Sequence, residues 1–180
     1  MKKENFEIVV KYSRWEIEII DTNDCSKILE LKKISKSWFS TNNSGSFFIG
    51  NTKYELLTKN NGAHLLENGY KKVGQVTFSD QRTSGYSRSA NIEIEGMNLV
   101  FTRENLKQIF ALATEDDNTV LTITGKLYPE RQKNLFKFFY IDDKLYHSVI
   151  LNEHITRINL LLILVICGYS IRFFLEMDSD

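Results

Sequence analysis

The feature that most constrains the fold of this chain is an uncharged, apolar segment near its C-terminal end. Residues 158–171 lie between Arg157 and Arg172, and residues 160–166 are seven consecutive aliphatic side chains. Seven apolar residues fill nearly two helical turns, so a helix here has no polar face and must be enclosed by protein or lipid. The fourteen residues would span about 21 Å as a helix, less than the roughly 30 Å of a bilayer core. We therefore predict a core helix at about 158–175.

Most of the chain before this segment alternates between apolar and polar residues, which is the period of a β-strand. Phe6, Ile8 and Val10, for example, fall on one face of an extended segment. About ten short strands are indicated by this pattern, at 6–12, 15–19, 47–49, 54–56, 76–78, 92–94, 99–101, 121–123, 136–140 and 145–150. Asn68-Gly69 predicts a tight hairpin, since two-residue hairpin turns need positive φ. Such close spacing favours antiparallel pairing.

One segment breaks the alternation and predicts a short amphipathic helix over Arg103–Ala113. A possible cap, Thr102, precedes it, and its apolar residues stand at helical spacing: Leu106, Ile109, Phe110 and Ala113. The remaining elements have a simple physical solution, in which the sheet closes into a barrel and the apolar helix fills the interior. Closure also removes the edge strands that invite aggregation. We therefore expect one domain over 1–180, mainly β, built as a closed antiparallel barrel around a central C-terminal helix, with one short additional helix.

Three stretches carry a family resemblance: Tyr54-Glu55-Leu56-Leu57, Leu65-Leu66-Glu67-Asn68-Gly69-Tyr70-Lys71-Lys72-Val73-Gly74-Gln75-Val76 and Leu160-Leu161-Leu162-Ile163-Leu164-Val165-Ile166. In this order, among strands throughout, they resemble the tubby-like superfamily of tubby C-terminal domains, LURP-one-related proteins and phospholipid scramblases. The likeness covers most of the chain but rests on the order of elements and not on a diagnostic motif. It implies about twelve strands around a hydrophobic C-terminal helix.

The resemblance also implies a function, namely binding of membrane lipids, especially phosphoinositide headgroups, at the cytoplasmic face of a membrane. Tubby domains hold phosphates with a lysine and an arginine two residues apart, and this sequence has no Lys-x-Arg triplet. No family site is therefore carried over. The local basic candidates for lipid binding are pairs in or near predicted turns: Lys71 and Lys72, Arg82 and Arg88, and Arg131 and Lys133. Ordinary solvated loop charge is the competing interpretation, because lipid-binding clusters usually hold four to eight basic residues.

Residues that could carry catalysis or a metal are sparse. His147 and His154 are seven positions apart, and no cysteine or carboxylate pattern completes a zinc site with them or with His64. Cys25 has no adjacent base, and Cys167 falls in the apolar segment, so neither thiol is activated. The sequence contains no nucleophile elbow and no phosphate-binding glycine loop. We expect a non-enzymatic protein with no metal and no cofactor.

The charge balance and the cysteine content restrict the classes of binding partner and the cellular compartment that we expect for this chain. Basic and acidic residues both total 23, so the chain lacks the basic excess of a nucleic-acid binder. Two distant cysteines and a start without a signal-peptide pattern are typical of a reduced, cytoplasmic chain. We expect a monomer whose partner is an anionic lipid or another protein, with peripheral membrane contact.

Two alternatives remain open at this point. In the first, the apolar segment extends to Leu175 as a tail anchor, with Arg172 snorkelling from its last turn. Its short length and the acidic residues after it, Glu176, Asp178 and Asp180, speak against this. In the second, the domain is a protein-interaction or structural module, in which the aromatic strand 135–140 contributes to a partner surface.

Overall fold

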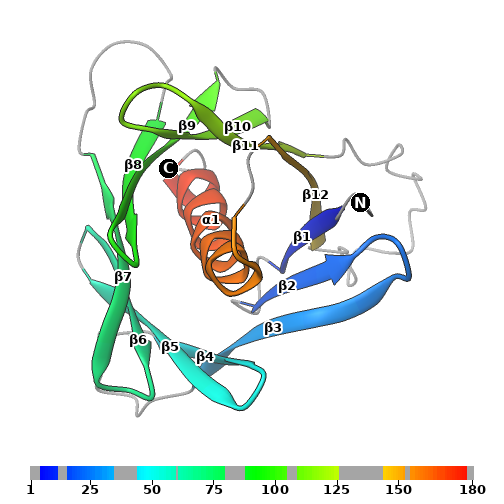
Figure 1. Cartoon of the computed structure of the whole chain (residues 1–180), viewed down its shortest axis with the longest axis vertical. Coiled ribbons are helices and arrows are strands. Elements are labelled where there is room, and N and C mark those ends of the chain that lie inside the picture. Colours follow the sequence, from blue (N-terminus) through cyan, green and yellow to red (C-terminus); the bar gives the residue numbers. More distant parts are fainter. Residues whose placement is uncertain are drawn as a thin grey trace, which may run out of the picture.

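The computed structural model describes residues 5–11, 16–34, 44–59, 61–79, 88–104, 109–125, 144–152 and 155–177. These residues form twelve β-strands and one α-helix. The strands are β1 (Phe6–Lys11), β2 (Glu16–Asp21), β3 (Ser26–Ile34), β4 (Ser44–Ile49), β5 (Thr52–Lys59), β6 (Gly62–Glu67), β7 (Lys71–Phe78), β8 (Arg88–Ile94), β9 (Met97–Glu104), β10 (Ile109–Thr114), β11 (Thr119–Gly125) and β12 (Lys144–Leu151). The helix is α1 (Arg157–Met177), and Figure 1 shows it surrounded by the strands.

The strands form a closed barrel in which each strand pairs antiparallel with the next one along the chain. Closure joins β1 to β12, where Phe6 pairs with Val149 and Ile8 pairs with His147. This arrangement leaves no edge strand in the barrel, so every strand has a hydrogen-bonded neighbour on both sides. The predicted mainly-β, closed antiparallel barrel is confirmed, and so is the strand number that the resemblance implied.

Alternation places the apolar side chains inside the barrel, as the sequence pattern predicts. Ile17 and Ile19 of β2 are buried, whereas Glu16 and Glu18, which alternate with them, lie on the outer face. Those two glutamates form ion pairs with Lys11 of the neighbouring strand β1, at 3.0 and 2.9 Å. The two faces of a strand thus differ in chemistry with a period of two.

Helix α1 fills the barrel interior and confirms the predicted core helix, with bounds slightly wider than 158–175. Every residue from Leu160 to Ile171 is buried, and α1 contacts β1, β2 and β8. Over Arg157–Phe174 the helix is long and apolar enough to cross a membrane, but most of this stretch is buried in the protein. The barrel wall therefore supplies the enclosure that an all-round apolar helix requires.

The predicted short helix over Arg103–Ala113 is wrong wherever the structure describes this segment. Arg103 belongs to β9, and Ile109 to Ala113 belong to β10, which pairs with β9. Phe110 and Leu112 are both buried in the barrel. Burial of every second residue is the pattern of a strand and not of a helix. Packing against the neighbouring strand thus overrides a local spacing that also fitted a helix. Residues 105–108, and the aromatic strand predicted at 136–140, lie outside the described residues.

Candidate functional site

The end of the barrel at which α1 begins carries short turns. The turns at 22–25, 50–51, 68–70, 95–96 and 115–118 all lie there, and we call it the short-turn end. Seven residues with positive φ lie in these turns: Cys25, Gly50, Asn68, Gly69, Glu95, Gly96 and Asp117. Asn68 and Gly69, with φ of 52° and 81°, form the hairpin turn that the sequence predicted.

The large apolar side chains that the described structure exposes lie at this same end. Tyr70 sits in the β6–β7 turn with 80% of its surface exposed, and Phe48 is 59% exposed beside the β4–β5 turn. Ile150, near the end of β12, and Ile158, in the first turn of α1, are 51% and 53% exposed. Contiguous exposed apolar surface is what marks an interaction site, and of these residues Phe48 and Tyr70 lie on neighbouring hairpins, because β5 pairs with β6.

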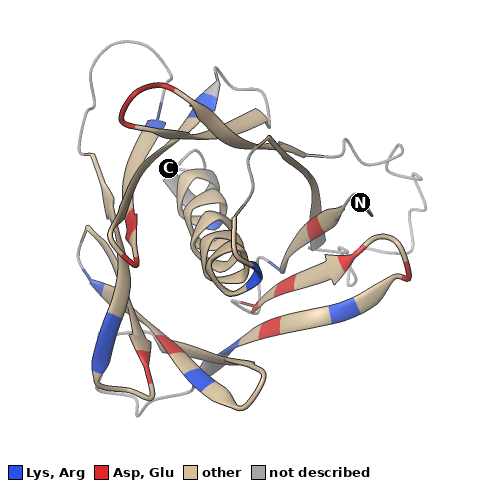
Figure 2. Ribbon diagram, in the orientation of Figure 1, with Lys and Arg blue, Asp and Glu red and all other residues tan. Residues whose placement is uncertain are grey.

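Two of these residues belong to a surface that we call the aromatic-basic patch, which consists of Phe48, Lys53, Tyr70, Lys71 and Lys72. Phe48 and Lys53 are directly paired between β4 and β5. The neighbouring β6–β7 hairpin is held to them because the Asn68 amide donates to the Lys53 carbonyl at 2.8 Å. Figure 2 shows basic residues at the start of β7 and on β5. The pairing of the strands therefore brings the β4–β5 and β6–β7 hairpins together into one surface.

The three lysines of the patch differ in their partners. Lys53 pairs with Glu55 at 2.8 Å and Lys71 pairs with Glu67 at 2.9 Å. The hydrogen bond that the Lys71 ammonium group donates to Glu67 raises the pKa of Lys71. Lys72 instead donates to the neutral Gln75 side chain, at 2.7 Å. Exposed ion pairs of this kind are weak and exchange readily with other anions, so the patch can present positive charge to a ligand.

The sequence candidates for lipid binding fall in different places. Lys71 and Lys72 are exposed at the short-turn end, whereas Arg88 begins β8 at the opposite end. Arg88 lies on the same strand face as buried Ala90 and pairs in register with Arg103, which is also buried. The structure therefore does not bring Arg88 together with the two lysines. Arg82, Arg131 and Lys133 lie outside the described residues.

Sequence reasoning missed Phe48, Lys53 and Tyr70 as members of a candidate site. Tyr70 was detectable, because a large aromatic residue directly after Asn68-Gly69 and before two lysines falls at a hairpin tip. Phe48 and Lys53 carry no such local signal. They join the patch only through the pairing of β4 with β5 and of β5 with β6.

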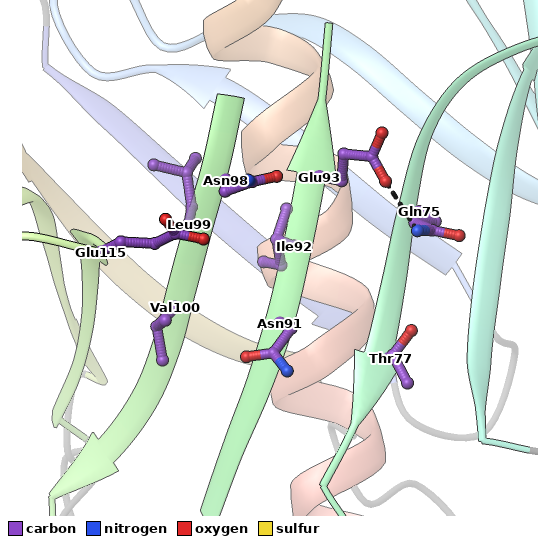
Figure 3. A pocket seen from close by; sticks show the side chains of 9 residues that line it. All are labelled: Gln75, Thr77, Asn91, Ile92, Glu93, Asn98, Leu99, Val100 and Glu115. Atoms are coloured by element: carbon purple, nitrogen blue, oxygen red, sulfur yellow. Dashed lines mark hydrogen bonds between the residues drawn. The ribbon is translucent and has the colours of Figure 1, made fainter. Parts of the chain in front are cut away.

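A second candidate is a groove on the outer face of β7, β8 and β9, with a volume of about 300 Å³. We call it the polar groove; its outward polar residues are Gln75, Thr77, Asn91, Glu93, Asn98 and Glu115. Gln75, Glu93 and Asn98 stand side by side in one cross-strand row. Figure 3 shows the Gln75 amide directed at Glu93, to which its Nε2 donates at 2.7 Å.

Two titratable side chains inside the barrel, Cys167 and His147, are buried. Cys167 is fully enclosed, and burial raises the pKa of its thiol far above the usual range, so the reactive thiolate is suppressed. His147 is buried edge-on to the Phe110 ring, with 5.9 Å between the ring centroids. Among the described residues, no group of three His, Cys, Asp or Glu side chains could hold a metal ion.

Comparison of the chain with protein-family models, with curated proteins and with solved structures found no match.

Proposed function

We propose that this protein is a non-enzymatic binding module that docks on anionic lipid headgroups at the cytoplasmic face of a membrane, using the aromatic-basic patch. The observation that carries the proposal is the position of two exposed aromatic side chains, Phe48 and Tyr70, beside three exposed or half-exposed lysines. In this proposal α1 stays inside the barrel, and only the hairpin tips touch the membrane.

The chemistry of the patch fits the interface of a bilayer. Tyrosine has an apolar ring and a polar hydroxyl, and it is enriched where a membrane surface offers both environments. Each lysine near an anionic membrane contributes about 1 kcal/mol of attraction. Phosphate-bearing headgroups, including phosphoinositides, can accept hydrogen bonds from the Lys71 and Lys72 ammonium groups. The tight turns hold these residues in place, which limits the entropy lost on docking.

Sedimentation with vesicles tests this proposal. The purified full chain should pellet with phosphatidylcholine vesicles that contain phosphatidylserine or a phosphoinositide, and should stay in solution with phosphatidylcholine alone. The substitution pair K71Q/K72Q should weaken binding about tenfold, because it removes up to about 2 kcal/mol of attraction. Tyr70→Ala should weaken binding to both anionic compositions by removing the apolar contact.

Lys59→Gln is the matched control for the lysine variants. Lys59 is exposed and lies on β5 like Lys53, but at the opposite end of the barrel. The Lys59→Gln protein should bind vesicles like the wild type. Equal weakening by K59Q and K71Q/K72Q would mean that general charge, and not the patch, governs binding. Protein that resists an alkaline carbonate wash of cell membranes would instead indicate the tail anchor.

A further inference from the structure

Three side chains of the aromatic-basic patch point away from the barrel axis. Phe48 follows Phe47, which is buried in the core, so Phe48 lies on the outer face of β4. Lys53 pairs with Phe48 across to β5 and shares this face. Lys72 donates to Gln75 on the outer face of β7. A membrane lying flat across the end of the barrel would therefore meet the edge of this patch and not its exposed face.

The far side of the same barrel end is acidic. The turn that joins β10 to β11 holds three exposed carboxylates, Glu115, Asp116 and Asp117, and we call these residues the acidic turn. Figure 2 shows acidic residues in this turn, on another side of the barrel from the basic residues of β5 and β7. Because β11 is the fourth strand after β7 in the barrel, the two lie about 19 Å apart along the wall. The acidic turn is thus too distant to neutralise the lysines of the patch.

We propose that the protein docks on an anionic membrane with its barrel axis tilted, so that the outer face of the β4–β5 and β6–β7 hairpin tips meets the headgroups while the acidic turn stays clear of them. This inference rests on the membrane docking proposed above and adds its orientation. In a flat approach, the three carboxylates would come as near to the membrane as the three lysines, and repulsion would offset attraction.

A moderate tilt is enough to separate the two charges. A tilt of roughly 30° lifts a point about 19 Å away by about 9 Å, which exceeds the screening length of about 8 Å at physiological ionic strength. The same tilt turns the outer wall at Phe48 and Lys53 towards the membrane. The outward direction of the patch and the position of the acidic turn therefore favour the same orientation.

The tilt also divides the exposed apolar residues of the short-turn end. Phe48 lies on the docking side, whereas Ile158 lies at the start of α1, inside the ring of strands. Their exposed fractions are similar, 59% and 53%, so they form a matched pair. Phe48→Ser should weaken binding to anionic vesicles about tenfold by removing a buried apolar contact, and Ile158→Ser should leave binding unchanged. Equal losses in the two variants would overturn the tilt.

A fluorophore that brightens in an apolar environment measures the orientation directly. In the full chain, Cys25→Ser removes the exposed thiol while Cys167 is buried, so one new cysteine can be labelled. Asn51→Cys and Asn118→Cys are matched positions, because both asparagines are exposed in turns of the short-turn end. With vesicles of phosphatidylcholine and phosphatidylserine, the label at 51 should brighten severalfold as it enters the interface, and the label at 118 should keep its brightness in solution.

Charge reversal in the acidic turn tests the cause of the tilt. In E115K/D116K the turn attracts the membrane, so the label at 118 should now brighten and vesicle binding should strengthen at least about tenfold. A folding defect cannot produce this gain. If the label at 118 stays dark on vesicle-bound E115K/D116K, the acidic turn does not set the orientation.

The remaining outcomes separate the orientation from the docking itself. Equal brightening of the labels at 51 and 118, without the charge reversal, would overturn the tilt and leave membrane docking in place. Labelled protein that does not pellet with the anionic vesicles would overturn the docking, and with it the tilt.

Discussion

Gly168 of α1 lies against Ile17 of β2 so closely that a Cβ atom built on the glycine would stand 2.8 Å from Ile17 Cγ2. The Ile8 Cγ2 atom of β1 would be 3.1 Å away. Gly168→Ala should therefore destabilise the protein by about 1–3 kcal/mol through overpacking, although alanine is the better helix former. Urea unfolding followed by circular dichroism measures this change in the free energy of unfolding.

A double-mutant cycle assigns the cost of G168A to the contact with Ile17. Ile17→Ala removes the methyl group that the new Cβ would meet, so G168A should cost less in that background than in the wild type. The two substitutions should couple by about 0.5–3 kcal/mol. Strict additivity of the two losses would show that the contact with β2 is not the source of the strain.

The apolar helix was predictable because its signal is local. Residues 160–166 leave no polar face on a helix, whatever surrounds it. Closure of the barrel is different, since it joins Phe6 to Val149 across most of the chain, and alternation within a strand does not name its partner. Ile109 and Phe110 show the limit of local spacing, because they fitted a helix yet pair with β9.

The candidate surfaces depend even more on register. Lys71 and Lys72 are adjacent in sequence and were predictable as a basic pair. The row of Gln75, Glu93 and Asn98 comes from three strands, and a shift of one residue would move any of them to the other face. The strand face of Arg88 was also predictable from sequence, because it has the same parity as the apolar residues that follow it on β8.

Replacing Leu162 or Val165 by aspartate should abolish soluble folding. Both side chains are buried inside the barrel, where an unpaired charge costs several kcal/mol, comparable to the whole stability of a domain. Soluble yield and size-exclusion chromatography measure the outcome. Ile158→Asp, at the exposed start of the same helix, is the control and should stay soluble. A folded, monomeric Leu162→Asp protein would contradict the enclosed position of α1.

The hydroxyl group of Tyr169 ties the far half of α1 to the barrel wall. It donates to the Gly62 carbonyl of β6 at 3.1 Å, in a buried environment. Tyr169→Phe should lower the free energy of unfolding by about 1–3 kcal/mol, because the carbonyl loses this partner while the ring packing is kept. Thermal or urea unfolding measures the loss. An unchanged stability would mean that this hydrogen bond has no net effect on folding.

His64 gives the barrel a stability that depends on pH. Burial lowers its pKa below the ordinary 6.5, and the positive charges of Lys59 and Lys72 lower it further. The unfolded chain therefore takes up a proton more readily than the folded protein does. The stabilisation is fully present above about pH 6.5 and is lost as the pH falls through the folded pKa. His64→Gln should remove this part of the acid-side decline, measured as the free energy of unfolding between pH 5 and pH 8.

The pKa of the same histidine reports two nearby charges, that of Lys72 in the patch and that of Lys59 at the opposite end of the barrel. Lys59→Gln and Lys72→Gln should each raise the pKa of His64, and Lys59→Gln should do so at least as strongly, because Lys59 makes the larger contribution. An NMR titration of the His64 imidazole measures both shifts. If an anionic headgroup occupies the patch near Lys72, it should also raise this pKa, since it screens a positive charge. A His64 pKa that Lys72→Gln leaves unchanged would place the Lys72 ammonium group too far away to act on the imidazole.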